Sequence, residues 1–308
     1  MMMYNWIEIG GETDGTTHKL SYFEKGSPKN GTVLITAGVH GAEETSILAV
    51  MKLISWLNSM DVQKRVLIVP VCNLSGFHQH SNRIVPEDGQ NLNRVFPPKP
   101  TNHAADLIAR TLVESFVLQS DWHMDLHGGD IRESVMPFVY YAGVGDEEMV
   151  NKSREMALAT GFTTIVKSNA QTGFYNHSGI LGKPSILMER GGAGVRVEEQ
   201  VTLYFKEILN VLCYLGVVGK SVEDSPRQVN TLEIQTARYP LAAKSGFWVP
   251  SLSPGQVFEK GETLGVIYDV QMNELQRIIA EGRGIVLYQV MSLGIYEGSE
   301  TVAYGLLE

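Results

Sequence analysis

The segment from residue 31 to residue 59 constrains the fold more than any other part of the chain. Residues 31–38 read GTVLITAG, a short β-branched apolar run that is typical of a buried strand. After Val39 the chain continues into HGAEETSILAVMKLISWLNS, where apolar side chains recur at helical spacing. A strand that runs directly into a helix is the first half of a parallel α/β unit.

The same alternation continues to residue 216. Further strands are expected at 65–73, in a segment ending at MDLHGG, near 135–141, at 163–167 and at 184–192. Helices are expected at 103–118, near 146–160 and at 198–216. The predicted fold class is therefore α/β, with a mixed, largely parallel sheet flanked by helices.

The last quarter of the chain has a different pattern. Residues 218–230, VGKSVEDSPRQVN, are polar and carry Gly and Pro, and short strand-like runs follow them to the C-terminus. A length of 308 residues also suits one large domain with a smaller partner. We predict a boundary near residue 225, with an α/β domain at 1–225 and a smaller all-β domain at 226–308.

Composition argues against several classes of protein. The formal net charge is -9 and no dense Lys/Arg cluster occurs, which argues against nucleic acid as a partner. No targeting segment or membrane-spanning apolar run is evident, so we predict a cytoplasmic protein that does not bind membranes. Cys72 and Cys213 both lie in apolar segments and are expected to be buried thiols.

A metal site is indicated where the first strand meets its helix. His40 is expected on the connecting loop and Glu43 in the first helical turn, so that one cation could reach both. Catalytic zinc takes three protein donors and leaves a position for water. His127 is the third candidate, because it ends a predicted strand at the edge where α/β sheets bind ligands, and Gly128 and Gly129 allow a ligand to approach the backbone. One Zn²⁺ per chain is therefore predicted.

Chance is the competing explanation, because the chain has eight histidines. Three of them lie near loops and are expected at the surface: His78, His80 and His103. His123 shares a strand face with Asp125 and His127 but lies further back in the strand. We expect it in the core, or in support of a metal ligand.

Four motifs in a fixed order carry a resemblance to a known family. They are HGAEE at 40–44, NLNR at 91–94, DLHGG at 125–129 and MERGG at 188–192. Over roughly residues 30–215 the chain resembles the succinylglutamate desuccinylase/aspartoacylase family, which is related to the zinc carboxypeptidases. The resemblance implies a carboxypeptidase-like fold and a zinc-dependent hydrolase that cleaves an amide bond in a small carboxylate such as an N-acyl amino acid.

The resemblance also implies roles for individual residues. Glu189 would be the catalytic base and acid, Asn93 and Arg94 would hold a substrate carboxylate, and Arg83 would contact the transition state. A carboxyl group placed after the apolar run PSILM is expected to be partly desolvated, which raises its pKa. An arginine can bind a carboxylate with two parallel hydrogen bonds. The alternatives are a structural ion pair for Glu189 and a solvated surface position for Arg94.

Two departures from the family pattern bear on the substrate. Asn91 stands where the family usually has Asp, and the stretch before Glu189 has only Lys183 where aspartate-releasing members have an arginine. This argues against N-acetylaspartate as the substrate. Arg132 or Arg190 could compensate, although Arg190 is expected to point to the opposite strand face from Glu189.

The C-terminal part resembles a lipoyl/biotinyl-type barrel-sandwich hybrid, without a lysine at the expected hairpin. It is expected to shield the site or to mediate self-association as a homo-oligomer. Three functions stay open at this point. They are a deacylase of N-acyl amino acids, a zinc carboxypeptidase or cell-wall peptide amidase acting on short peptides, and a non-catalytic carboxylate-binding protein.

Overall fold

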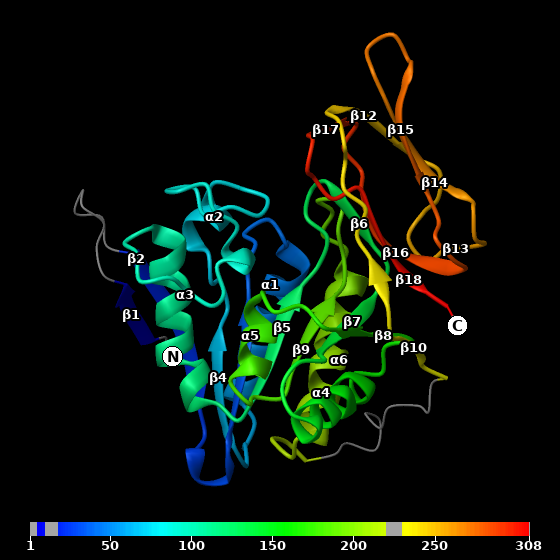
Figure 1. Cartoon of the computed structure of the whole chain (residues 1–308). Helices are drawn as coiled ribbons and strands as arrows, with labels where there is room; N and C mark the ends of the chain where they lie inside the picture. The colour runs from blue at the N-terminus through cyan, green and yellow to red at the C-terminus, as the bar shows by residue number, and fades with distance from the viewer. Residues whose placement is uncertain (1–4, 10–17, 220–229, 308) are drawn as a thin grey trace.

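A nine-stranded sheet forms the centre of the larger part of the molecule in the computed structural model, which describes residues 5–9, 18–219 and 230–307. The strand order is β1-β2-β4-β3-β5-β9-β7-β8-β10 (Figure 1). The strands are β1 (Asn5–Ile9), β2 (His18–Lys25), β3 (Thr32–Ala37), β4 (Arg65–Val69), β5 (Trp122–His127), β7 (Phe138–Ala142), β8 (Thr164–Ser168), β9 (Ser185–Glu189) and β10 (Leu232–Ile234). Five of the neighbouring pairs are parallel and three are antiparallel. The prediction of a mixed, largely parallel sheet is confirmed.

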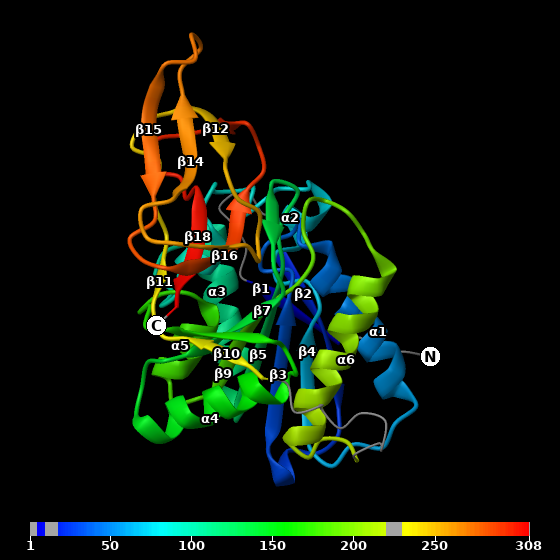
Figure 2. The ribbon, with the colours of Figure 1, turned by 90° about the vertical axis from the view of Figure 1, so that its right-hand side faces the viewer.

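Helices cover both faces of this sheet. One face packs against α1 (Glu44–Asn58), α4 (Glu147–Ala159) and α6 (Glu198–Tyr214), and the opposite face packs against α3 (Ala104–Ser115) and α5 (Phe174–Ile180). Figure 2 shows α1 and α6 on one side of the strands and α3 and α5 on the other. A short helix α2 (Leu74–His78) and three 3-10 turns complete this part: η1 (Pro28–Asn30), η2 (Leu92–Arg94) and η3 (Val117–Gln119).

The predicted helices are present, with one difference near the candidate metal site. Glu43 is the N-cap residue of α1 and does not lie in its first turn. The antiparallel hairpin of β1 and β2 and the short helix α5 were not predicted, because neither has an apolar run long enough to give a clear period.

The C-terminal part consists of two antiparallel sheets, so the prediction of an all-β unit is confirmed. One sheet has the order β11-β18-β16-β13 with β6 paired to β16, and the other has the order β15-β14-β12-β17. The strands are β6 (Glu133–Val135), β11 (Ala237–Arg238), β12 (Gly246–Pro250), β13 (Val257–Phe258), β14 (Thr263–Tyr268), β15 (Glu274–Ile279), β16 (Gly284–Val290), β17 (Gly294–Ile295) and β18 (Val302–Leu306). The closer likeness to a barrel-sandwich hybrid stays a prediction.

The two parts share a hydrophobic core. Phe138 and Leu187 of the main sheet pack with Leu287 and Ala303 of the C-terminal sheets. The predicted boundary near residue 225 falls in 220–229, outside the described residues, and stays a proposal. On its far side β10 joins the main sheet beside β8, while β6 leaves the α/β part to pair with β16. Strands therefore exchange across this division and fix the C-terminal sheets against the larger part.

Two further predictions concern burial. Cys72 is buried as expected, whereas Cys213 is only half-buried. Cys213 lies near the end of α6, with its Sγ 3.8 Å from the Gly219 carbonyl oxygen.

Within residues 5–9, 18–219 and 230–307, no helix is long and apolar enough to cross a membrane.

Candidate active site

Three side chains predicted as metal ligands meet at one edge of the main sheet. His40 follows β3, Glu43 caps α1, and His127 is the last residue of β5. Because β3 and β5 are parallel neighbours, their carboxyl ends lie at the same edge. His40 Nδ1 lies 2.6 Å from Glu43 Oε1, and His127 Nδ1 lies 3.0 Å from Glu43 Oε2. One ligand atom from each residue falls within 4.8 Å of the others.

Neighbouring oxygen atoms orient both imidazole rings. His40 Nε2 lies 3.1 Å from Asn91 Oδ1, and His127 Nε2 lies 3.2 Å from Asp125 Oδ2. If each Nε2 carries the proton and donates it to that oxygen, each Nδ1 presents its lone pair to the Glu43 side of the site. Asn91 supplies the acceptor here although the family usually has Asp at this position.

The donor set fits a metal ion. Two imidazole nitrogens and a carboxylate face one another, which is the arrangement of a catalytic zinc site. Glu43 Oε2 is buried and accepts no hydrogen bond of good geometry from the described residues, although His127 Nδ1 is close to it. Burial opposes ionisation of Glu43, but the two histidines outweigh it and lower the pKa of the carboxyl. The lowered pKa favours the ionised carboxylate, which is the form that binds a metal.

A buried hydrogen-bond chain supports His127 from behind. Thr36 Oγ1 donates to Asp125 Oδ1 at 2.6 Å and lies 2.8 Å from His123 Nε2, and His123 Nδ1 lies 2.8 Å from Ser178 Oγ. His123 is fully buried, and this burial lowers its pKa to about 4 against the opposing charge of Asp125. His123 thus occupies the core position predicted for it, whereas His78, His80 and His103 are exposed as expected.

The glycines after His127 lie in close contact with neighbouring backbone segments. A Cβ on Gly128 would lie 2.3 Å from the Arg190 carbonyl oxygen, and one on Gly129 would lie 2.6 Å from the Glu133 carbonyl oxygen. These glycines therefore allow neighbouring chain segments to pass close to the end of β5. Gly128 also lines the cavity beside the cluster, and the expectation that these glycines let a ligand approach stays a prediction.

Glu189 lies at the carboxyl end of β9, next to the metal cluster. Its register partner in the adjacent parallel strand is His127. Partial burial and the nearby Glu43 carboxylate raise the pKa of Glu189 well above its ordinary range. Among the described residues, none forms a salt bridge with Glu189, so the structural ion pair considered above is absent there. Arg190 points the other way and binds Glu207 and Gln200 of α6, as the strand alternation predicted.

A cavity of about 480 Å³ connects these groups. Its walls include Asn93, Arg94 and Arg83, the three further residues proposed from the sequence. Asn93 is buried, and its Oδ1 accepts a hydrogen bond from the Phe174 backbone N–H at 2.8 Å. This bond fixes the side chain against the start of α5 and leaves its amide nitrogen as the remaining hydrogen-bond donor.

The two arginines differ in exposure. The Arg94 side chain is 53% exposed, and its Nη2 lies 3.4 Å from Glu300 Oε1. Arg83 is 29% exposed, forms an ion pair with Glu133 and lies within 4 Å of Asp130 and Glu300. Arg132, in contrast, is exposed and lies in a neighbouring groove outside this cavity.

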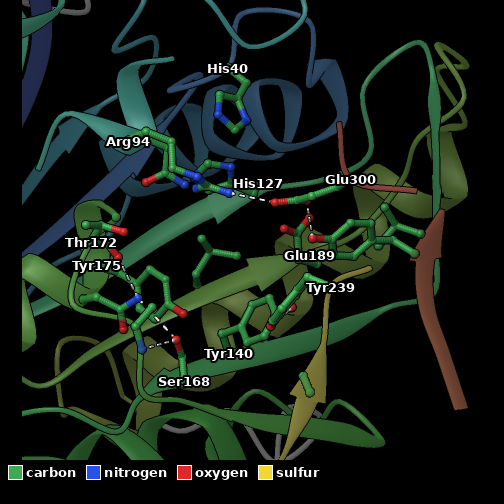
Figure 3. Close-up of a pocket in the computed structure, with 18 of the residues that line it drawn as sticks. His40, Arg94, His127, Tyr140, Ser168, Thr172, Tyr175, Glu189, Tyr239 and Glu300 are labelled. Carbon is green, nitrogen blue, oxygen red and sulfur yellow. Dashed lines mark hydrogen bonds and ion pairs between the residues drawn. The ribbon is translucent and has the colours of Figure 1, made fainter. Parts of the chain in front are cut away.

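Several residues of the cavity were not predicted. They are aromatic and acidic side chains contributed by β7, α5 and the C-terminal part: Tyr140, Tyr175, Tyr239, Tyr288 and Glu300. Figure 3 shows Tyr140, Tyr175, Tyr239 and Glu300 arranged around the same space as His40, His127 and Glu189. No motif marks these positions in the sequence, and the docking of the C-terminal sheets brings Tyr239, Tyr288 and Glu300 to the site.

Comparison with known proteins gives concordant matches. The family model described as "Succinylglutamate desuccinylase/Aspartoacylase catalytic domain" matches residues 29–215. The N-alpha-acetyl-L-2,4-diaminobutyric acid deacetylase of Halomonas elongata is 30% identical over 243 residues, which are 78% of this chain and 71% of that protein.

Two solved structures share the fold. A succinylglutamate desuccinylase/aspartoacylase from Rhodobacter sphaeroides has a TM-score of 0.83 at 23% identity, covering 99% of this chain and 96% of that one. The product-bound ectoine utilization protein EutE (DoeB) from Ruegeria pomeroyi has a TM-score of 0.83 at 20% identity, covering 99% and 95%. Both likenesses include the C-terminal sheets.

Proposed function

Because the chain belongs to the succinylglutamate desuccinylase/aspartoacylase family, we propose that it is a zinc-dependent deacylase that hydrolyses the amide bond of an N-acyl amino acid. The observation that carries this proposal is the convergence of His40, Glu43 and His127 beside Glu189 in a single cavity. These groups come from different elements of the fold. A purely structural explanation of their convergence would have to account for all of them together.

His40, Glu43 and His127 would hold the zinc ion. Bound there, zinc would supply Lewis-acid chemistry, polarising the scissile carbonyl and lowering the pKa of water to about 7. The oxygen acceptors Asn91 and Asp125 keep the ligand rings in the required orientation.

Glu189 would move the proton. Its carboxylate accepts a proton from the attacking water molecule, and the resulting acid donates it to the nitrogen of the leaving amine. The raised pKa of Glu189 suits both steps, because the group must bind and release a proton near neutral pH. The absence of an ion-pair partner among the described residues leaves the carboxyl free to face the substrate.

Arg94 and Asn93 would bind the carboxylate of the substrate. Arg94 offers several N–H donors and is exposed to the cavity, and the Asn93 amide nitrogen lies on the same wall. Arg83 would stabilise the negative charge that develops on the carbonyl oxygen. Its ion pair with Glu133 holds the guanidinium in place.

The cavity supports a small substrate over a polypeptide. A volume of about 480 Å³ is within the range of small-molecule sites. Tyr239, Tyr288 and Glu300 of the C-terminal part line one side of the cavity. The relative from Halomonas elongata is named for N-alpha-acetyl-L-2,4-diaminobutyric acid, so that compound is the first substrate to test.

Metal content and amine release together test the proposal. Elemental analysis of the purified protein is combined with detection of primary amine released from N-acyl amino acids and from short peptides. We expect one zinc ion per chain and release from N-acyl amino acids, with both lost in His127→Ala. Release from peptides alone would favour the peptidase, and a protein that binds no metal after reconstitution would contradict the proposal.

A further inference from the structure

Glu300 is an acidic side chain that the C-terminal part carries into the cavity. It precedes β18, and its side chain is 23% exposed. The Tyr288 hydroxyl donates a hydrogen bond to Glu300 Oε2 at 3.0 Å, and Arg83 Nη1 lies 3.9 Å from the same oxygen. One carboxylate oxygen is thus anchored to the wall, which fixes the direction of the other.

The second oxygen of Glu300 is available to a ligand. Its contact with a described residue is the 3.4 Å approach of Arg94 Nη2, from a side chain that is itself more than half exposed. Figure 3 shows this contact at the side of the cavity that holds His127 and Glu189. Glu300 Oε1 therefore lies beside the group proposed to hold the substrate carboxylate and retains lone pairs for another donor.

Each arginine near this oxygen already has a carboxyl group as a partner. Arg83 and Arg94, the two arginines assigned to the substrate, are faced by Glu133 and Glu300. A second substrate carboxylate placed here would meet Glu300 in a partly desolvated site, where like charges repel strongly. An ammonium group at the same place would instead gain a charge-assisted hydrogen bond.

We propose that Glu300 is a specificity-determining residue that recognises a positively charged side chain on the N-acyl amino acid. This inference rests on the proposed function. Arg94 then binds the carboxylate of the substrate while Glu300 accepts from its side-chain ammonium. Selection works in both directions, because the same carboxylate attracts the cation and repels an anion.

The competing outcome is a preference for an anionic side chain, and Lys167 is the residue that would explain it. It also lines the cavity, so an anionic side chain that reached it would be favoured. Arg238, another cation of the lining, is already paired with Glu281 at 2.7 Å. Preference for an anionic substrate would therefore overturn the role of Glu300 and direct attention to Lys167.

Three substrates of similar size separate these outcomes. Nα-acetyl-2,4-diaminobutyrate has a cationic side chain, N-acetylnorvaline has an uncharged side chain of the same shape, and N-acetylaspartate has an anionic side chain. The readout is the ratio of kcat/KM between the cation and its isostere. We expect a preference of about tenfold or more for the cation in the unaltered protein, falling toward unity in Glu300→Gln.

The matched control is Glu297→Gln. Glu297 lies three residues away, is exposed, contacts Lys244 at 3.7 Å and does not line the cavity, so the ratio should stay at the value of the unaltered protein. Zinc content and circular dichroism of both variants establish that they fold. An unchanged ratio in Glu300→Gln, or a preference of the unaltered protein for norvaline or aspartate, would overturn the inference while leaving the deacylase intact.

Binding of the free amino acids distinguishes failure of the inference from failure of the proposed function. Isothermal titration with 2,4-diaminobutyrate and norvaline needs no turnover. Selective binding of the cation that is lost in Glu300→Gln, without hydrolysis of any acyl compound, would support the charge recognition and contradict the deacylase. No binding and no turnover would contradict both.

Discussion

His127 and Glu189 are register partners at the carboxyl ends of β5 and β9, two adjacent parallel strands. Paired residues in neighbouring strands point to the same face of a sheet, so the candidate metal ligand and the candidate proton carrier face the same cavity. Arg190, one residue further, points to the opposite side and binds Glu207. Consecutive residues therefore have different surroundings: Glu189 faces the cavity, whereas Arg190 is held by Glu207.

Glu189→Gln should keep the fold and the zinc ion and lose activity. Glutamine has nearly the same shape but cannot accept and return the proton, so kcat on an N-acyl amino acid should fall by about 10²–10⁴-fold. Zinc analysis and steady-state kinetics check this, with Glu199→Gln, an exposed position at the start of α6, as the control. A variant that retains most of its kcat would remove Glu189 from the proposed role.

Asp125→Asn should weaken zinc binding without changing a direct ligand. The carboxylate of Asp125 faces His127 Nε2 and also accepts from Thr36, so an amide there loses the charge that supports the ligand ring. We expect affinity to fall by about 10–100-fold in a competition titration with a chelator. Asn91→Asp is the companion variant, because it retains an oxygen acceptor for His40 and should keep its affinity. Equal affinities in the unaltered protein and Asp125→Asn would contradict the supporting role.

The meeting of the three candidate metal ligands could be predicted because it follows from local sequence patterns and one rule of sheet topology. His127 ends β5, His40 and Glu43 lie between β3 and α1, and the carboxyl ends of these parallel strands meet at one edge of the sheet. Apolar periodicity located those strands and the long helices, while element ends were less certain, as the N-cap position of Glu43 shows. The burial of Cys213 was overestimated for a related reason, since an apolar neighbourhood in sequence does not fix the exposure of a position near a helix end.

The remaining site residues depend on contacts that no local pattern records. Glu300 and Tyr288 reach the cavity only because β16 and β18 dock on the main sheet, and β6 pairs with β16 across a long separation in sequence. Asn93 likewise acts through its bond to α5, a helix too short to be predicted. The pairing of strands between the two parts of the molecule therefore completes the site. Only its candidate metal ligands could be predicted from local sequence patterns.

Arg94→Ala should mainly weaken substrate binding. The guanidinium is exposed to the cavity, and its removal deletes the charge-assisted bonds to the substrate carboxylate, so KM should rise about tenfold or more with a smaller change in kcat. Arg94→Lys should recover only part of the loss, because lysine cannot form the two parallel bonds. Kinetics with a substrate whose carboxylate is blocked as an amide provide the control, since that compound should not distinguish the variants. An unchanged KM for the free carboxylate would exclude Arg94 from the clamp.

His123 should make the stability of the metal-free protein depend on pH. Its folded-state pKa of about 4 lies below the ordinary value of 6.5, so the unfolded chain binds the additional proton between these values. The free energy of unfolding should therefore fall as pH drops from about 6.5 to 4, with a contribution from this group of about 3 kcal/mol at most.

Urea unfolding of zinc-stripped protein at pH 7 and pH 5 measures this dependence. His123→Gln should be less stable at pH 7, because it disturbs the hydrogen bonds to Thr36 and Ser178, yet it should lose less stability between the two pH values than the unaltered protein. The contribution of His127 is common to both proteins, so the difference between the two slopes reports His123. His103→Gln, at an exposed position, should leave the slope unchanged. Equal slopes for His123→Gln and the unaltered protein would mean that His123 takes up its proton in the folded chain as readily as in the unfolded one.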